Sequence, residues 1–251
     1  MDNKITSLER LIKEAKNIVF FGGAGVSTES GIPDFRGKDG LYKLKSKWDK
    51  PYAVMLSHTY YEEQTENFFN FYREFMINTT AKPNFAHQYL AELEKKKNLT
   101  IITQNIDGLH QIAGSKNVLE LHGSIHRNYC TNCMRMYSLE EILTMENVPR
   151  CPICGGIIKP DVVLYEEELN EATLTKALIT LQQADLLIIA GTSLNVYPAA
   201  SMINYFYGNN IVLINKTHLP INKKIKLEIN QAVGEVFKQI SDLEKKEPKN
   251  E

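Results

Sequence analysis

The stretch IVFFGGAGVST, residues 18–28, joins a short apolar run to a glycine-rich turn. A continuous apolar run of this kind is typical of a strand that is covered on both faces, as in a parallel sheet. Glycines let backbone N–H groups approach a phosphate, and the N-terminus of a following helix favours its charge. The strict G-x-G-x-x-G pattern fails, because Thr28 stands where its last glycine would be. Taken alone, this loop is a weak dinucleotide signal, and a tight turn is the alternative.

The same pattern of strand and helix recurs along the chain. Further apolar runs, each expected to be a strand, occupy residues 99–102, 186–190 and 211–214. Apolar residues at helical spacing predict helices around residues 7–16, 86–93, 174–181 and 233–240. Helices that alternate with strands over short connections predict an α/β fold with a doubly wound parallel sheet.

Two regions interrupt this rhythm. Residues 38–83 are rich in Tyr, Phe and Lys, and residues 126–160 hold all four cysteines. Both are expected to be insertions that form a smaller second lobe, the first of them partly helical.

Composition narrows the function classes. The chain has 251 residues and a formal net charge of −1, so a nucleic-acid partner is not expected. The first fifteen residues have no long apolar core, which argues against a signal peptide. Residues 186–215 carry no charge, but Asn and Pro interrupt them, whereas a spanning helix needs roughly 20 mostly apolar residues. We expect a soluble, cytoplasmic protein that does not enter a membrane.

The four cysteines form two Cys-x-x-Cys pairs. Cys130 and Cys133 are separated from Cys151 and Cys154 by residues 134–150, a spacing typical of a structural zinc site. Zinc takes four thiolates in a tetrahedron, and such a closed site leaves no position for a reactive water. Two disulfides or four free thiols are the alternative, which the missing secretory signal disfavours.

Two histidines, His122 and His126, stand just before the first cysteine pair. Four sulfur ligands saturate the zinc, so neither imidazole is needed as a ligand. His122 is the better candidate for a general base, because it follows the apolar residues 118–121 and precedes a glycine, at the tip of a predicted strand. A surface or structural histidine remains the favoured reading when these residues are taken alone.

Polar loops follow the other predicted strands, where open α/β sheets bind their ligands. Residues 191–193, Gly-Thr-Ser, offer hydroxyls to phosphate or ribose oxygens. Asn215 follows its strand where dinucleotide folds often place a ribose-binding acid. Asn105 and Asp107 are two residues apart and could hold a carboxamide, although Asx residues are equally common as turn formers.

Together these segments resemble the sirtuins, the NAD-dependent protein deacylases. Besides the cysteine pairs, the matching strings are GAGVSTESGIPDFRG (23–37), TQNIDGLH (103–110), LHGS (121–124), KPDVVLYEE (159–167), GTSLNVYPAA (191–200) and IN (214–215). They occur in family order across nearly the whole chain. The resemblance implies a Rossmann-like NAD-binding domain of residues 1–37, 84–125 and 161–251. Its smaller partner would combine a helical insertion, 38–83, with a zinc ribbon, 126–160.

The resemblance also implies a role for individual residues. The side chains expected around NAD are Ala24, Thr28, Phe35, Arg36, Gln104, Asn105, Ile106, Asp107, His122, Thr192, Ser193, Asn215 and Ala232. Among these, His122, Asn105 and Asp107 would be catalytic. The segment Val163, Leu164 and Tyr165 would bind the substrate backbone by β-augmentation, with Val163 against the acyl-lysine.

The implied reaction removes acetyl groups from lysine side chains and gives free lysine, nicotinamide and O-acetyl-ADP-ribose. His122 would take a proton relayed from a ribose hydroxyl, a suitable task for an imidazole with a pKa of about 6.5. The family usually has Phe-Gly-Glu where this chain has Tyr165-Glu166-Glu167, which places the local geometry in question. Phe69 and Tyr72 occupy the positions where succinyl-removing members carry Tyr and Arg, so a succinyl group is not expected.

Other activities remain as alternatives. A preference for longer neutral acyl chains and a mono-ADP-ribosyltransferase activity would use the same pocket. A zinc-ribbon module for nucleic acid ranks last, because residues 126–160 carry few basic groups. We expect acetylated proteins or peptides as partners, and a monomer.

Overall fold

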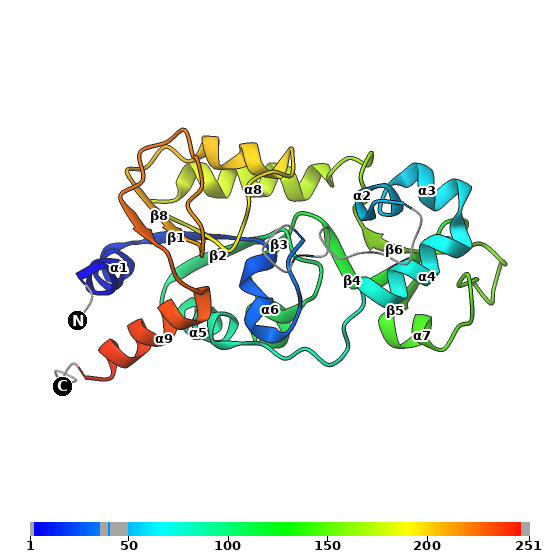
Figure 1. Cartoon of the computed structure of the whole chain (residues 1–251), viewed down its shortest axis with the longest axis horizontal. Coiled ribbons are helices and arrows are strands. Elements are labelled where there is room, and N and C mark those ends of the chain that lie inside the picture. The colour runs from blue at the N-terminus through cyan, green and yellow to red at the C-terminus, as the bar shows by residue number, and fades with distance from the viewer. Residues whose placement is uncertain (1–2, 36–39, 41–49, 247–251) are drawn as a thin grey trace.

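The computed structural model describes residues 3–35, 40 and 50–246. Its main element is a six-stranded parallel sheet in the order β3-β2-β1-β7-β8-β9 (Figure 1). The strands are β1 (Asn17–Gly22), β2 (Asn98–Thr103), β3 (Val118–Glu120), β7 (Leu186–Ala190), β8 (Asn210–Ile214) and β9 (Leu227–Ile229). Counted along the chain, these are the third, second, first, fourth, fifth and sixth strands of the sheet, which is the Rossmann order. The predicted fold class is confirmed.

Helices cover both faces of this sheet, as the continuous apolar strands require. Ile18 and Phe20 of β1 face α1 (Asn3–Glu14), α5 (Phe85–Glu94) and α9 (Val233–Glu244). Val19 and Phe21 face the opposite side, where α8 (Glu171–Gln183) and the 3-10 segment η4 (Ala199–Tyr205) pack. Because side chains alternate along a strand, one apolar run serves both layers.

Two elements differ from the sequence-based expectation. The first helix runs from Asn3 to Glu14 rather than over residues 7–16. Strand β9 was not expected, because it is short and only Ile229 of its residues is buried. Its neighbour β8 supplies the pairing that holds it.

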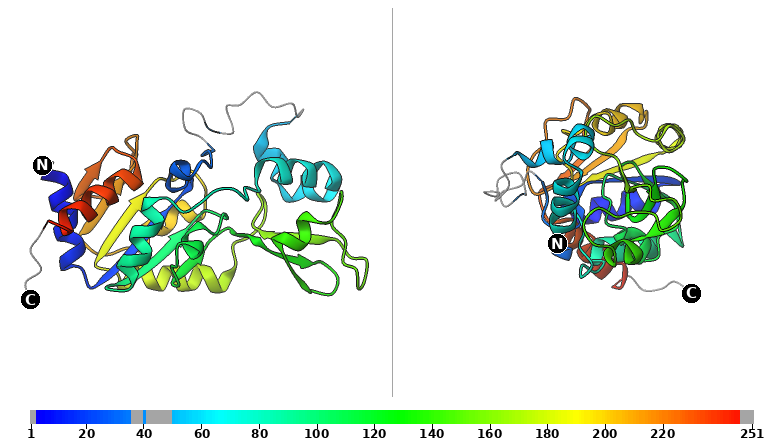
Figure 2. Two further views of the ribbon diagram at one scale, coloured as in Figure 1. Left: turned by 90° about the horizontal axis from the view of Figure 1, so that it is seen from below. Right: turned by 90° about the vertical axis from the view of Figure 1, so that its right-hand side faces the viewer.

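The second lobe contains a three-stranded antiparallel sheet in the order β5-β4-β6. Its strands are β4 (Gly123–Cys130), β5 (Met136–Ser138) and β6 (Ile158–Val162). The helices are α2 (Tyr52–Met55), α3 (His58–Glu63), α4 (Thr65–Phe75) and α7 (Leu139–Leu143). Figure 2 shows this lobe at one end of the large sheet.

An aromatic core holds the helices of the second lobe to its sheet. Phe68, Phe69 and Tyr72 of α4 are fully buried and share a cluster with Ile125 of β4 and Val162 of β6. Leu139, from the second expected insertion, belongs to the same cluster, so side chains from both insertions build one core. The predicted domain limits at 125–126 and 160–161 fall within β4 and β6, and the limit at 37–38 lies outside the described residues.

None of the described helices is long and apolar enough to cross a lipid bilayer.

Candidate active site

Three loops meet where β1, β2 and β7 end. The N–H of Gly25 donates to the carbonyl of Gly191 over 2.7 Å. The N–H of Gln104 donates to Gly22, at the end of β1, and its side-chain Nε2 lies 3.1 Å from Thr192 Oγ1. These loops lie at the point where the strand order reverses, which is where open α/β sheets bind their ligands.

Glycine allows this close approach of the loops. A Cβ atom on Gly25 would lie 2.8 Å from the Cα of Gly191, so no other residue fits without a backbone shift. Gly191 itself has φ +57°, in the left-handed region that favours glycine. The loop continues as two 3-10 turns, η1 (Ala24–Val26) and η2 (Thr28–Ser30), which carry the predicted cofactor residues Ala24 and Thr28. Small side chains thus line an edge that a pyrophosphate could approach.

A hydrogen-bonded cluster joins the first of these loops to the second. Ser27 Oγ lies 2.6 Å from Asp107 Oδ2 and 3.1 Å from Asn105 Nδ2. The second carboxylate oxygen of Asp107 accepts the N–H of Leu109 at 2.9 Å, so the acid is held from two sides. Ser27 was not among the predicted site residues, although its hydroxyl lies within the glycine-rich string. Asn105 and Asp107 are thereby brought beside the glycine-rich loop.

His122 is fixed in one tautomer by a backbone carbonyl. Its Nδ1 lies 2.9 Å from the carbonyl oxygen of Gln104. That oxygen can only accept, so Nδ1 carries the proton and Nε2 keeps its lone pair. Burial lowers the pKa of His122 below its usual value, although the bond to Gln104 opposes this shift. At neutral pH the ring is therefore uncharged, and its Nε2 can accept a proton or a hydrogen bond.

His126 also binds the second loop rather than the metal. Its Nε2 lies 3.1 Å from the carbonyl oxygen of Asp107, and its ring fills the space beside Gly108. Neither His122 nor His126 belongs to the cysteine cluster described below. Both histidines hold the loop between Gln104 and Asp107, one from each end.

The other predicted cofactor residues lie around these loops. Phe35 and Ile106 pack against the aromatic core of the second lobe and so lie between the two lobes. Asn215 follows β8 and donates from Nδ2 to the carbonyl of Thr217 at 2.9 Å. Ser193 follows Thr192 directly and is partly exposed. Arg36 lies outside the described residues.

Ala232 is placed beside the glycine-rich loop by a helix cap. It is the N-cap residue of α9, and the N–H of Gly234 in the first turn donates to Glu29 Oε2 of η2 over 2.7 Å. An acid at a helix N-terminus accepts an otherwise unpaired N–H and is favoured by the helix dipole. The start of α9 is therefore tied to the same loop as Ala24 and Thr28.

The predicted substrate segment lies next to His122. The N–H of Val163 donates to the carbonyl of His122 at 3.1 Å. On its other side, Tyr165 donates to Leu56 and accepts from the N–H of His58, both at 2.9 Å. Leu164 is buried between them in the aromatic core. This segment thus continues β6 across the space between the second lobe and the predicted base.

Glu166 occupies the position of the family glycine in a conformation that suits glycine. Its φ is +75°, in the left-handed region. Its carboxylate accepts from the backbone N–H of Thr59 at 2.9 Å and from the Thr59 hydroxyl at 2.7 Å. The pKa of Glu166 is lowered by these bonds. The chain therefore turns at Glu166 in a glycine-like conformation, and the side chain of Glu166 ties this turn to the first turn of α3.

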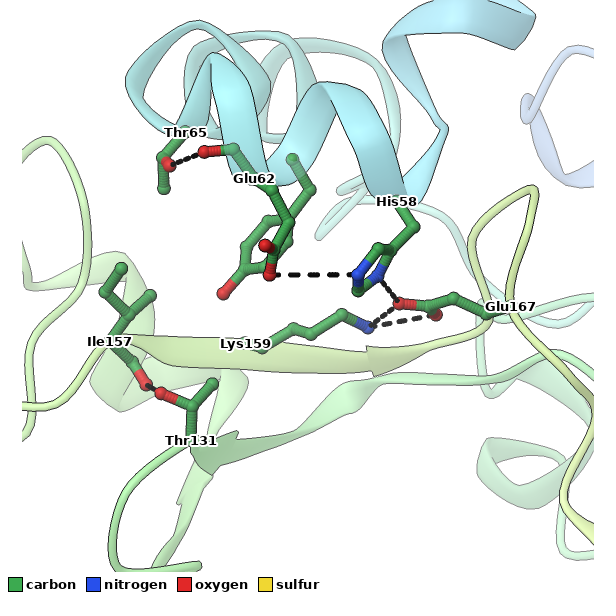
Figure 3. A pocket seen from close by; sticks show the side chains of 8 residues that line it. His58, Glu62, Thr65, Thr131, Ile157, Lys159 and Glu167 are labelled. Carbon is green, nitrogen blue, oxygen red and sulfur yellow. Dashed lines mark hydrogen bonds and ion pairs between the residues drawn. The ribbon is translucent and has the colours of Figure 1, made fainter.

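Glu167 makes a second tie to the same helix (Figure 3). Its carboxylate lies 2.9 Å from His58 Nδ1 and 3.1 Å from Lys159 Nζ, and it accepts the N–H of Leu164 at 2.9 Å. Burial alone would raise the pKa of Glu167, but these three partners lower it. Glu166 and Glu167, the two acids that follow the substrate segment, are thus both hydrogen-bonded within the protein.

A cavity of about 430 Å³ lies beside these ties, between α3 and the zinc ribbon. Its lining residues are His58, Tyr61, Glu62, Thr65, Thr131, Ile157, Lys159 and Glu167. None of the predicted cofactor residues lines it. The cavity therefore lies among α3, the cysteine-bearing segment and Glu167, and not at the loops at the ends of the large sheet's strands.

The four cysteines are gathered into one cluster. The sulfur atoms of Cys130, Cys133, Cys151 and Cys154 all lie within 4.8 Å of one another, and none forms a disulfide. A zinc ion with bonds of about 2.3 Å in a tetrahedron needs sulfurs about 3.8 Å apart, which this cluster fits. The closed sulfur set confirms the predicted metal site. The buried hydroxyl of Tyr137 lies 3.0 Å from Cys151 Sγ.

A Rossmann-like sheet, a histidine-bearing site at its strand ends and a four-cysteine second lobe together define a sirtuin-type architecture. A model of the Sir2 family matches residues 23–198, and the chain belongs to that family.

Similar proteins span nearly the whole chain. An NAD-dependent protein deacetylase of Clostridium tetani is 56% identical over 233 residues, which are 92% of this chain and 94% of the relative. A Staphylococcus aureus protein of the same name is 40% identical, over 96% of this chain and 99% of its own. A solved Sir2 structure with a p53 peptide and NAD+ is 35% identical with a TM-score of 0.85, over 96% of this chain and 99% of that one. A Sir2 protein bound to acetylated peptide has a TM-score of 0.86 at 34% identity, with the same coverage.

Proposed function

We propose that this chain removes acetyl groups from protein lysine side chains, with NAD as the co-substrate and one structural zinc ion. The products are free lysine, nicotinamide and O-acetyl-ADP-ribose. The single observation that carries this proposal is the main-chain hydrogen bond from the N–H of Val163 to the carbonyl of His122, which joins the substrate segment to the residue that carries the imidazole. Relatives named NAD-dependent protein deacetylase, which match nearly the whole chain, support it.

The proposed roles follow from the chemistry of each group. His122 acts through Nε2 and takes the proton that a ribose hydroxyl gives up when its oxygen attacks the acyl carbon. Asn105 and Asp107 hold the nicotinamide carboxamide, since an amide and a carboxylate together can satisfy its N–H and C=O groups. Gln104 contacts the nicotinamide ribose beside His122.

The remaining cofactor and substrate residues are proposed by position. Phe35 shields the reacting ribose carbon from water, and Thr192, Ser193 and Asn215 hold phosphate and adenosine ribose, with Ala232 near the adenine. Ala24 and Thr28 line the same site, with Ile106 at the nicotinamide end and Arg36 near them. The residues proposed for the substrate backbone are Val163, Leu164 and Tyr165.

The acyl preference is proposed from the helical insertion. Phe69 and Tyr72 are fully buried in the aromatic core. Arg73 donates to backbone carbonyls of Asn147 and Met145, so its charge is used within the lobe. Neither Phe69 nor Tyr72 can supply a cation, so a succinyl carboxylate buried against these two side chains would have no charged partner from them, at a cost of several kcal/mol. Acetyl and longer neutral acyl groups are therefore preferred.

The test is incubation with NAD and peptides that carry acetyl, butyryl, myristoyl or succinyl lysine, with products identified by mass. Formation of O-acetyl-ADP-ribose and free lysine peptide supports deacetylation. Transfer of ADP-ribose to the peptide, without loss of the acyl group, would replace this proposal with the transferase alternative. Faster turnover of butyryl or myristoyl lysine than of acetyl lysine would favour the alternative of a deacylase for longer neutral acyl chains.

Partners and organisation are proposed on the same basis. Acetylated proteins or peptides are the substrates, nucleic acid is not a partner, and the chain is a monomer located in the cytoplasm. We propose residues 1–37, 84–125 and 161–251 as the NAD-binding domain. Residues 38–83 and 126–160 then form the small domain, and its strands β4 and β6 continue into the large one.

A further inference from the structure

Strand β4 carries an irregularity close to the proposed active site. Ser124 pairs with Asp161 of β6, and the next pair along β4 is Asn128 with Pro160. Residues 125–127 therefore have no partners on β6, although the neighbours Pro160 and Asp161 are adjacent. Bulges of this kind are frequent next to active sites, where they redirect side chains.

Residues in the bulge contact the loops of the large domain. The N–H of Ile125 donates to the carbonyl of Ile106 at 3.0 Å, and the ring of His126 lies against Asp107. Arg127, the third residue of the bulge, forms ion pairs with two acids. Its Nη1 lies 2.7 Å from Glu120 Oε2, and its Nε lies 2.8 Å from Asp161 Oδ2.

Each of the two acids lies two residues before one partner of the Val163–His122 bond. Glu120 is the last residue of β3, two residues before His122. Asp161 lies in β6, two residues before Val163. Since Val163 also donates to the carbonyl of His122, Arg127 forms a second link between the same two segments.

We propose that Arg127 is a positioning residue, whose guanidinium joins Glu120 to Asp161 and so fixes the spacing between the base segment and the substrate segment. This inference rests on the proposed deacetylase function. Arginine suits the task, because its planar fork can bind two carboxylates in a defined geometry, whereas lysine offers one point charge.

The charges explain what the loss of Arg127 would do. The Glu120 side chain is only 10% exposed, and its Oε2 is paired with the guanidinium of Arg127. The other carboxylate oxygen of Glu120, Oε1, accepts from Gln111 Nε2 at 2.8 Å. Without the guanidinium, Glu120 and Asp161 repel each other across the gap. That repulsion moves the two segments apart and weakens the bond between Val163 and His122.

The experiment compares Arg127→Met with wild type and with Arg10→Met, which breaks an exposed pair with Glu14 on α1. Steady-state kinetics is measured with an acetylated peptide and NAD, together with nicotinamide exchange. For Arg127→Met we expect the peptide KM to rise by about tenfold or more, because misplacement of bound groups is costly. The NAD KM should stay within about twofold, since Arg127 is paired with Glu120 and Asp161 rather than with an acid of the glycine-rich loop. In Arg127→Met, the ratio of the nicotinamide exchange rate to the deacetylation rate should increase.

A second substitution separates positioning from simple packing. In the double variant Arg127→Met with Glu120→Gln, one of the repelling charges is removed, so the peptide KM should recover in part. Arg127→Lys should lie between wild type and Arg127→Met. If Arg127→Met does not fold, Asp161→Asn tests the same link, and the same rise in peptide KM is expected.

Hydrogen exchange gives a readout that does not depend on turnover. Faster exchange at 118–123 and 160–165 in Arg127→Met, but not in Arg10→Met, is expected. Three outcomes would each overturn the role of Arg127. They are an equal change in the peptide and NAD KM values, no recovery of the peptide KM in the double variant, and unchanged hydrogen exchange at 118–123 and 160–165. If wild type and Arg10→Met both fail to form O-acetyl-ADP-ribose, the proposed function fails instead, and hydrogen exchange still decides on the link.

Discussion

The backbone N–H of Val163 donates to the backbone carbonyl of His122 over 3.1 Å. His122 follows the end of β3 in the large sheet, and Val163 follows the end of β6 in the second lobe. The proposed base and the proposed acyl-lysine contact are therefore attached to each other by the main chain. Gly123 makes this possible, because its φ is +74° and a Cβ atom there would lie 1.9 Å from the carbonyl oxygen of Asp161.

Replacement of His122 should separate the two halves of the proposed reaction. In His122→Ala we expect O-acetyl-ADP-ribose formation to fall by about 10²–10⁴-fold, the usual contribution of a general base. Nicotinamide exchange should partly survive, because release of nicotinamide precedes the proton transfer. The measurement is product formation by mass beside exchange with labelled nicotinamide, with the exposed His218→Ala as control. Full deacetylation by His122→Ala would remove the base assignment.

The pH dependence follows from the buried state of the same ring. Burial lowers the pKa of His122 below 6.5, and only the neutral ring can act as a base. Deacetylation should therefore rise with pH through a midpoint below 6.5 and reach its plateau by neutral pH. A pH profile of kcat/KM for the acetylated peptide measures this midpoint. An acid limb centred above 6.5 would contradict the assignment.

The hydroxyl of Tyr137 should help to retain zinc. It lies 3.0 Å from Cys151 Sγ, and a zinc-bound thiolate can only accept that hydrogen bond. Loss of such an outer partner typically weakens metal binding by about 10–100-fold. Tyr137→Phe should therefore release zinc to a chromogenic chelator faster than wild type does. Tyr129→Phe, in the neighbouring strand β4, is the control, and equal release rates in the two variants would dismiss the role of Tyr137.

Glu166 offers a test of how the chain replaces the family glycine. Its left-handed backbone is unfavourable for a side chain, but its carboxylate binds Thr59 twice. Glu166→Ala keeps the strain and loses the bonds, so it should have the lowest melting temperature. Glu166→Gly loses the bonds but relieves the strain, and should melt between Glu166→Ala and wild type. Glu168→Ala, at an exposed acid two residues further on, should melt like wild type. A Glu166→Ala variant that also melts like wild type would show that the Thr59 bonds add no stability.

Two buried histidines should make the protein sensitive to acid. Burial lowers the pKa of His87 to about 4 and the pKa of His110 well below 6.5. Below pH 6.5 the unfolded chain binds protons that the folded protein does not, so the free energy of unfolding falls as the pH drops toward 4. The limiting slope is about 1.4 kcal/mol per pH unit for each histidine.

The variant His110→Phe should reduce this slope. Phenylalanine keeps a ring beside Phe20 and His87 but cannot take up a proton. Urea unfolding at several pH values between 4 and 7 measures the free energy of unfolding for both proteins. Parallel curves for wild type and His110→Phe would show that His110 does not contribute to the acid sensitivity.

Several features of the protein could be predicted from short stretches of its sequence. The strands at 18–21, 99–102, 186–190 and 211–214 lie where the apolar runs place them, because a strand buried on both faces needs a continuous run. The two Cys-x-x-Cys pairs predicted the sulfur cluster, since a turn of that length brings two thiolates onto one metal. The polar loops after β1, β2 and β7 were expected to meet, because the carboxyl ends of parallel strands share one edge.

What the sequence by itself determined is therefore the main strands of the large sheet, the cysteine cluster and the polar loops at the strand ends. The tertiary structure alone decided the register of β9, the bulge in β4, the tautomer of His122 and the pairing of Arg127 with Glu120 and Asp161. Local patterns depend on the period of a helix or strand and on ligand spacing, so neighbouring residues suffice to reveal them. Pairings between distant segments depend on how separate layers pack, and no short stretch of sequence contains that information.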